Sequence, residues 1–165
     1  MNVQTLFASV LTFFSVGKQN KGDSLAIDIT NGFQIETPNI FVPWDIDERE
    51  LKKIFKAGSL KHVTEKYYTT SCTSLNGLNC MLGFHFQLDG ELNELEFFRT
   101  DYSDPQKSFD EFQKYFVGSF GNPTKTSKGN EGFNNYEWNL GKVQIVHFVY
   151  DRFGPEEHMR IKFTR

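Results

Sequence analysis

Two histidines at matching places in the chain are the first residues whose type and spacing suit chemistry. His85 and His147 lie 62 residues apart, and the segments they begin are alike: His85-Phe-Gln-Leu-Asp and His147-Phe-Val-Tyr-Asp. Paired imidazoles suit acid–base catalysis or metal binding. The spacing fixes no acidic residue as a third ligand, however, and equivalent positions of a repeat resemble each other because the fold is alike. We therefore expect no metal and no cofactor here.

Carboxylates form the second candidate group. Glu91, Glu94 and Glu96 are close enough in sequence to include a pair for hydrolysis, although a solvated strand beside a hairpin turn explains them better. The chain has no phosphate-binding loop, no dinucleotide-binding glycine pattern, no serine-hydrolase elbow and no zinc-protease motif. The sequence therefore predicts no catalytic residue. An enzyme, such as a hydrolase using His85 or His147, ranks last among the possible functions.

Composition indicates one aromatic-rich domain over residues 1–165. A chain of 165 residues is long enough for a real core, and 18 Phe, 6 Tyr and 2 Trp supply it. Net charge is −3, which argues against non-specific nucleic-acid binding. Cys72 and Cys80 are too few for a disulfide framework. A bridge across the loop between them is one alternative, but two reduced thiols in a cytoplasmic protein are expected.

The N-terminal segment, residues 1–39, predicts a short helix followed by a hairpin. Residues 3–16 carry apolar side chains at helical spacing, without the leading positive charge or cleavage site of a signal peptide, and are too short to span a bilayer. Residues 25–29 and 33–36 are expected to pair around Asn31-Gly32, which suits a tight turn. We expect a cytoplasmic protein that does not bind membranes.

Two helices share one local pattern, 61 residues apart. Glu50-Leu-Lys-Lys-Ile-Phe recurs as Glu111-Phe-Gln-Lys-Tyr-Phe. Asp47 is placed to cap the first helix, which Gly58 ends, and Ser108 is placed to cap the second, which Gly121-Asn-Pro ends. Each helix presents an apolar stripe that must be buried against a sheet.

Three strands are expected after each helix. They cover residues 64–70, 80–88 and 91–98 in the first unit (residues 40–100), and residues 134–140, 142–150 and 158–163 in the second (residues 101–165). Asp89-Gly90 and Gly141 supply tight turns. The fold class is therefore α+β, a duplicated αβββ-αβββ unit with an antiparallel sheet, helices on one face, and an N-terminal helix and hairpin.

Alternation along these strands divides the side chains between two faces of the sheet. Leu82, Phe84, Phe86 and Leu88 are expected to point into the core. The opposite face is expected to collect polar side chains and one Phe: His85, Gln87, Glu94, Glu96, Phe98, Asn135, Glu137, His147, Arg160 and Lys162. This face is either simply solvated or a docking surface for another protein.

Two resemblances accompany this pattern. The doubled helix-plus-strands order of residues 40–165 is similar in architecture to the beta-lactamase inhibitory protein, which implies binding through a sheet. Ile40-Phe-Val-Pro-Trp44 before a capped helix, Gly77-Leu-Asn-Cys-Met-Leu-Gly-Phe-His-Phe86, and residues 109–120 followed by Gly-Asn-Pro-Thr resemble small bacterial immunity proteins of polymorphic toxin and contact-dependent growth inhibition systems. The second resemblance implies a cytoplasmic inhibitor that binds and neutralises one cognate toxin protein domain, often a nuclease.

Charge distribution agrees with that implication. Residues 89–111 hold eight acids against two bases, a local net charge of −6 that would steer a cationic nuclease. The expected partner-binding residues lie in or beside this stretch: Asp89, Glu91, Glu94, Glu96, Asp101, Asp104, His85 and Glu137. The alternative function is a small-ligand-binding or envelope-assembly module of the same architecture.

Overall fold

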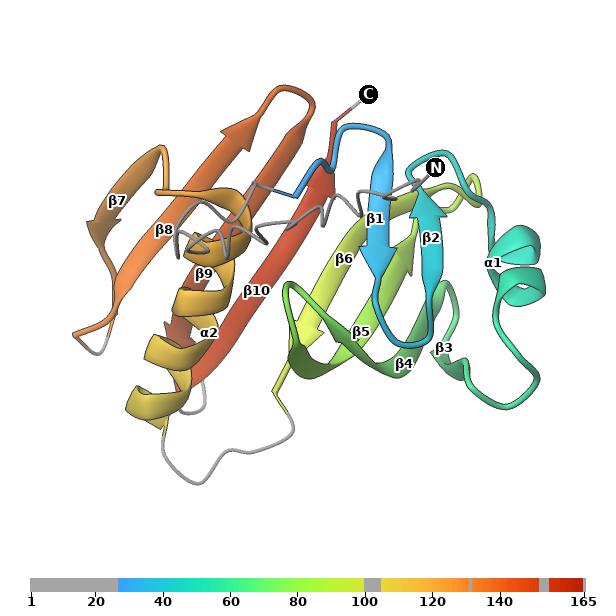
Figure 1. Ribbon diagram of the computed structural model, residues 1–165, viewed down its shortest axis with the longest axis horizontal. Coiled ribbons are helices and arrows are strands. Elements are labelled where there is room, and N and C mark those ends of the chain that lie inside the picture. Colours follow the sequence, from blue (N-terminus) through green and yellow to red (C-terminus); the bar gives the residue numbers. More distant parts are fainter. Residues whose placement is uncertain (1–26, 100–104, 131, 152–154, 165) are drawn as a thin grey trace, which may run out of the picture.

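The computed structural model describes residues 27–99, 105–130, 132–151 and 155–164 (Figure 1). Eight strands form one antiparallel sheet in the order β3-β4-β5-β6-β10-β9-β8-β7, and β1 and β2 form a separate hairpin. The elements are β1 (Gly32–Ile35), β2 (Ile40–Pro43), α1 (Glu48–Ile54), β3 (Lys61–Thr64), β4 (Tyr67–Ser74), β5 (Leu78–Phe86), β6 (Leu92–Phe98), α2 (Pro105–Phe120), β7 (Lys125–Lys128), β8 (Asn134–Leu140), β9 (Val143–Asp151) and β10 (Pro155–Phe163). The expected α+β class with an antiparallel sheet is confirmed.

The sheet order mirrors the two units about its centre. α1 is followed by β3 to β6, α2 is followed by β7 to β10, and the last strands of the two units, β6 and β10, pair with each other. Each unit therefore contributes four strands, and the expectation of three was wrong. The additional strands, β3 and β7, are four residues each and lie at the two sheet edges, where alternation is too brief to stand out in sequence.

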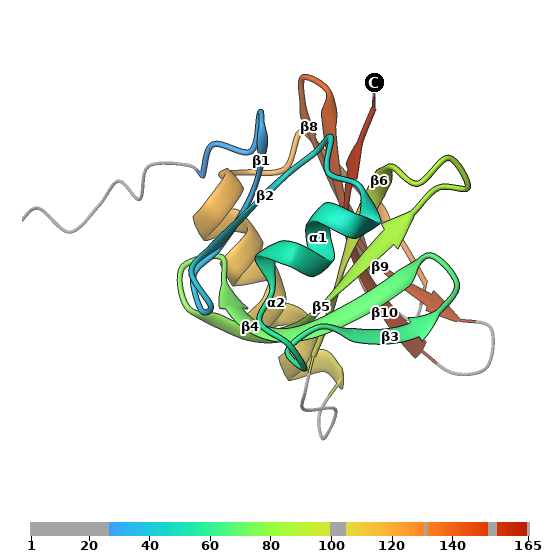
Figure 2. The same ribbon diagram turned by 90° about the vertical axis from the view of Figure 1, so that its right-hand side faces the viewer.

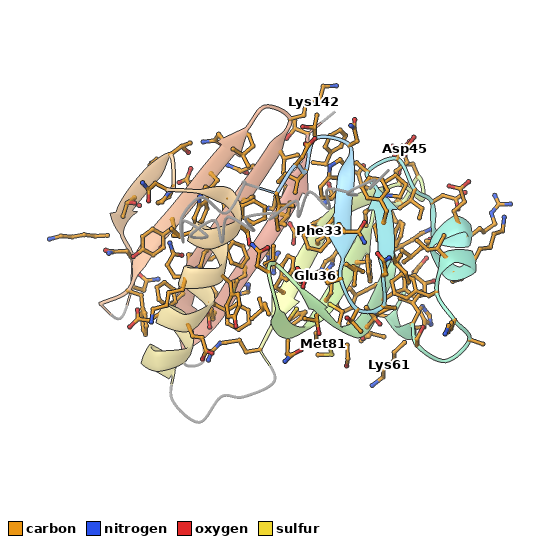
Figure 3. The ribbon with its side chains drawn as sticks, in the orientation of Figure 1. Phe33, Glu36, Asp45, Lys61, Met81 and Lys142 are labelled. Carbon is orange, nitrogen blue, oxygen red and sulfur yellow. The ribbon has the colours of Figure 1, made fainter. Side chains whose placement is uncertain are left out.

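Both helices and the hairpin lie on one face of the sheet (Figure 2). Phe55, which follows α1 directly, packs edge-to-face on Phe84, and Phe116 of α2 packs edge-to-face on Phe97. Phe33 of the hairpin, labelled in Figure 3, also packs on Phe97, with ring centroids 5.5 Å apart. Aromatic contacts of this geometry bury large apolar areas, so this covered face is the core of the protein.

Helix α1 begins as expected. The Asp47 side chain accepts a hydrogen bond of 2.8 Å from the Glu50 backbone amide, which satisfies one unpaired donor of the first turn. Ile46 and Leu51, on either side of the cap, are both buried. The helix ends at Ile54, earlier than Gly58 would allow, and Gly58 instead supplies a left-handed turn at φ +84°.

Helix α2 is longer than the sequence pattern indicates. It begins at Pro105, a residue well suited to a first helical turn, and not after Ser108. It ends at Phe120, where Gly121 takes φ +77° and its amide donates to the Val117 carbonyl at 2.9 Å. Phe109, like the two phenylalanines that follow it at helical spacing, is buried against the sheet.

The hairpin pairs different residues from those expected. β1 pairs with β2, so the turn spans residues 36–39 and not Asn31-Gly32. Glu36 at this turn (Figure 3) accepts hydrogen bonds from the backbone amides of Asn76 and Gly77, at 2.7 and 3.0 Å, and so fastens the hairpin to the β4–β5 turn. The expected N-terminal helix lies outside the described residues.

Other local expectations have mixed outcomes. Gly90 and Gly141 both take positive φ in the tight turns β5–β6 and β8–β9, as expected. Leu88 was expected in the core but is 90 % exposed, because β5 ends at Phe86 and Leu88 belongs to the turn. Cys72 and Cys80 lie opposite each other on β4 and β5 as free, buried thiols, their sulfur atoms 3.8 Å apart.

Candidate functional site

The face of the sheet opposite the helices is the candidate functional site. Within the described part of the chain, neither helix nor the hairpin packs on this face, since their ring contacts all involve the other face. Strand register places its side chains in three rows that cross the sheet, because residues directly opposite in an antiparallel pair share a face. We call these the polar row, the ion-pair row and the aromatic row.

The polar row runs Tyr67, His85, Glu94, Lys162, Gln144 and Asn139, from β4 to β8. Tyr67 stacks on His85 with ring centroids 4.3 Å apart and lies over Gly83, where a Cβ would meet its ring at 2.8 Å. Glycine at position 83 is therefore required for Tyr67 to lie flat across the strand. Burial, together with the charge of Glu96, raises the pKa of Tyr67 to about 12.

The ion-pair row runs Gly83, Glu96, Arg160, Val146, Glu137 and Lys125. Arg160 joins it to the polar row: its two terminal nitrogens contact Glu94 at 2.8 Å and Glu96 at 2.9 Å. Lys162 contacts Glu94 at 3.2 Å, and His85 contacts Glu96 at 2.7 Å. A planar guanidinium is suited to holding two carboxylates in fixed positions.

Glu96 is strongly held in its ionised form. Burial raises the pKa of Glu96, but hydrogen bonds with His158 and His85 and the charge of Arg160 outweigh burial and bring the pKa to about 2. The stabilisation is therefore complete above about pH 4.5 and is lost only as the pH falls toward 2. This centre of the face is fixed and electrically balanced at neutral pH.

The aromatic row consists of Met81 on β5, Phe98 on β6, His158 on β10 and Phe148 on β9, and it ends at Tyr150, two residues beyond Phe148 on the same face of β9. Met81 is opposite Phe98, and His158 is opposite Phe148. Phe97 is opposite Met159, so the next residues along β6 and β10, Phe98 and His158, are also opposite each other. Phe148 stacks on His158 at 5.1 Å, and Tyr150 meets the same imidazole edge-on at 6.2 Å. Met81 (labelled in Figure 3) and Tyr150 are 36 % and 45 % exposed, so this row presents apolar surface to solvent.

The expected partner-binding residues are only partly brought together. His85, Glu94, Glu96 and Glu137 lie on the open face, but Glu94 and Glu96 are 5 % and 7 % exposed and paired with cations, and Glu137 pairs with Lys125 at 2.9 Å. The negative bias expected of this face is therefore absent at its centre, where cations neutralise Glu94 and Glu96. Asp89 and Glu91 lie at the β5–β6 turn, at one end of the sheet. Asp101 and Asp104 lie outside the described residues.

His147 was expected on the open face and lies on the covered one. It is fully buried, opposite Tyr136 and Met159, which also face the core. His85 and His147 thus lie on opposite faces of the sheet. Residues 62 apart in sequence match in type, but they do not take equivalent positions in the register of β5 and β9, and a shift of one residue reverses the face. The same shift turns Phe148 and Tyr150 toward the open face, which alternation did not predict. Residues 142–150 are apolar on both faces of the strand, and this is the sequence signal that could have identified them.

A second polar cluster surrounds His147 inside the core. Its Nε2 lies 2.6 Å from Glu157 on β10, its Nδ1 lies 2.7 Å from Gln113 on α2, and Phe109 stacks on the ring at 4.0 Å. Glu157 also pairs with Arg99, which follows β6 and lies over the Phe112 ring. The cluster joins α2 to both halves of the sheet. The Glu157 carboxylate and the Arg99 guanidinium carry opposite charges, so the cluster has no net charge when the His147 imidazole is neutral.

Stability should fall in mild acid because of this histidine. Burial lowers the pKa of His147 below the usual value of 6.5, against the opposing effect of Glu157. At a pH between the lowered pKa of the folded protein and the usual value of the unfolded chain, the unfolded chain binds a proton that the folded protein does not. The free energy of unfolding is therefore at its plateau above about pH 7 and declines as the pH falls below about 6.5. Urea denaturation at pH 5 to 8 measures this slope.

Two variants test the assignment of that slope. His147→Gln should lower the plateau and remove most of the decline between pH 7 and 5, whereas His62→Gln, at an exposed site on edge strand β3, should leave the slope unchanged. An unchanged slope in His147→Gln would show that another group controls the acid sensitivity.

Among the described residues, no group of three or more His, Cys, Asp or Glu side chains is placed to hold a metal ion. None of the helices in that part of the chain is long and apolar enough to cross a membrane.

Comparison with known proteins gives one distant similarity. No family model matches the sequence, and no curated protein matches it. The structure is similar to the crystal structure of a DUF4309 family protein (YjgB) from Bacillus subtilis subsp. subtilis str. 168, with a TM-score of 0.41 and 11 % sequence identity. The alignment covers 72 % of this chain and 78 % of that chain.

Proposed function

We propose that this chain is an immunity-type binding protein that neutralises a bacterial toxin domain by docking on it through the open sheet face. The observation that carries the proposal is the aromatic row, which leaves apolar side chains partly exposed beside a rigid ion-pair centre. Large apolar side chains around a pre-organised polar centre are typical of protein interfaces, where a few aromatic residues contribute most of the binding energy.

In this proposal, attraction between an acidic face and a cationic toxin domain contributes less than the count of acidic residues in the sequence suggests. Glu94 and Glu96 are neutralised by Arg160 and Lys162, so the centre of the face offers little attraction to a cationic nuclease. We infer that apolar contact along the aromatic row provides most of the affinity. The acidic groups at the β5–β6 turn, including Asp89, would act at the rim and affect the association rate.

Charge reversal of Glu94 and Glu96 would not test docking cleanly. Changing both to lysine would place two ammonium groups at buried positions beside Arg160 and Lys162, with no carboxylate between them. We expect loss of folding from that pair, because an unpaired buried charge is strongly destabilising. Substitutions in the aromatic row are the better probes of the interface.

A co-expression experiment tests the proposed function. Where a large secreted protein is encoded directly upstream of this chain, its C-terminal domain, expressed in the bacterial cytoplasm, is the probe. The chain is expected to restore growth and to co-elute with that domain as a stoichiometric complex. No protection and no complex, together with recovery of the native chain from the periplasm, would instead favour the ligand-binding or envelope-assembly alternative.

A further inference from the structure

A hollow in the first unit, beside α1 and away from the second unit, has the features of a small-ligand site. It lies between the end of α1 and strands β3 and β4, and its volume is about 400 Å³, within the usual range for small-molecule pockets. Its lining is Lys52, Phe55, Lys56, Ala57, Gly58, Leu60, His62 and Tyr68. The open sheet face and its aromatic row contribute none of these residues.

The walls of the hollow are aromatic and apolar. Phe55 and Tyr68 are buried in the core cluster and keep one side toward the hollow, and Leu60 is packed against the same cluster. His62 lies over Tyr68 with ring centroids 4.9 Å apart. The core fixes Phe55, Leu60 and Tyr68 from behind, so a flat apolar group would meet a preformed surface there.

The rim of the hollow is cationic. Lys52 and Lys56 are four residues apart, and the Lys52 ammonium lies 4.9 Å from the centre of the Tyr68 ring. No carboxylate belongs to the described lining. The nearby Glu48 is engaged by Lys66 and by the Tyr68 hydroxyl, which donates to it at 2.8 Å, so only part of its charge offsets Lys52, 4.0 Å away.

We propose that this hollow binds a small aromatic carboxylate. The ring would lie against Phe55, Tyr68 and His62, and the carboxylate would lie between the two lysine ammonium groups. Aromatic stacking supplies contact area, and two cations beside a partly apolar wall favour an anion over a neutral molecule of the same shape. This site would be independent of toxin docking.

Titration with a matched pair of probes tests the proposal. Naphthalene-2-carboxylate and its neutral analogue naphthalene-2-carboxamide are added to isotope-labelled full-length chain, and backbone amide shifts are followed by NMR. The carboxylate is expected to shift Gly58, Ser59 and His62 in a saturable manner, with a dissociation constant at least fivefold lower than that of the carboxamide.

Two variants give the controls. Lys52→Gln/Lys56→Gln should weaken carboxylate binding at least fivefold and make the two probes bind equally, whereas Lys53→Gln, on the same helix but outside the lining, should change neither. Equal binding of both probes to the unaltered chain, or shifts centred on Phe148 and Tyr150 in place of Gly58, would overturn the proposal.

Discussion

Replacing Arg99 by methionine is expected to destabilise the fold by about 3 kcal/mol at pH 8. Arg99 and Glu157 are both 8 % exposed and pair with each other beneath α2. Methionine keeps much of the contact with Phe112 but leaves the Glu157 carboxylate in the core without its guanidinium. A buried charge without a partner is more costly than an uncharged pair of similar size.

The pH dependence of this variant distinguishes loss of charge pairing from loss of packing. Arg99 lowers the pKa of His147, so its removal should let His147 take up a proton and replace the missing positive charge. The difference in unfolding free energy between wild type and Arg99→Met should therefore shrink from pH 8 to pH 5.5. Urea denaturation at both pH values measures it.

A paired substitution completes the test. Arg99→Met/Glu157→Gln removes both charges and should recover at least half of the stability lost in the single variant. A loss below 1 kcal/mol in Arg99→Met, or a loss that does not change with pH, would show that the cluster contributes by packing alone.

Tyr150→Asp is expected to weaken toxin-domain binding at least thirtyfold, mainly through faster dissociation. Tyr150 is 45 % exposed at the end of the aromatic row, so the substitution should change folding stability little while placing a charge where an apolar contact is proposed. Surface plasmon resonance with the co-expressed toxin domain gives both rate constants, and growth protection gives the physiological effect.

Phe41→Asp is the matched control for this substitution. Phe41 is an aromatic residue of nearly the same exposure, 48 %, but it lies on β2, in the hairpin on the covered side of the sheet. Protection should be retained in Phe41→Asp and lost in Tyr150→Asp. If the two substitutions had equal effects, the open face would not be the docking surface. If neither the wild-type chain nor Phe41→Asp bound the toxin domain, the immunity function itself would be contradicted.

Local sequence patterns predicted much of the secondary structure. The Asp47 cap, the Asp89-Gly90 turn and the Gly141 turn depend on a few neighbouring residues and on backbone conformations that only certain side chains favour. The apolar stripe of α2 also predicted which face that helix buries, whereas in α1 Leu51 is buried as expected but Ile54, expected to face inward, is 39 % exposed. The first hairpin was misplaced because Asn31-Gly32 satisfies a turn locally, while Glu36 binds a turn 40 residues away, a contact that no local pattern contains.

The candidate site was predicted less well, and His147 shows why. Its match with His85 concerns residue order, whereas the face that a strand residue occupies depends on register, and a shift of one residue reverses every side chain of the strand. The same limit applies to Glu94 and Glu96. Alternation assigned them to the outer face, but their neutralisation depends on Arg160, 64 residues beyond Glu96, being brought opposite by the β6–β10 pairing.

The sequence by itself determined the α+β class, the doubled order of elements and the one-sided burial of the helices, since these follow from short-range periodicity and turn chemistry. Only the tertiary structure decided which charges are neutralised, which histidine is buried and which aromatic side chains remain exposed. Those properties depend on pairing between strands of different units, and the free energy of such long-range contacts is set by partners that a local segment does not specify.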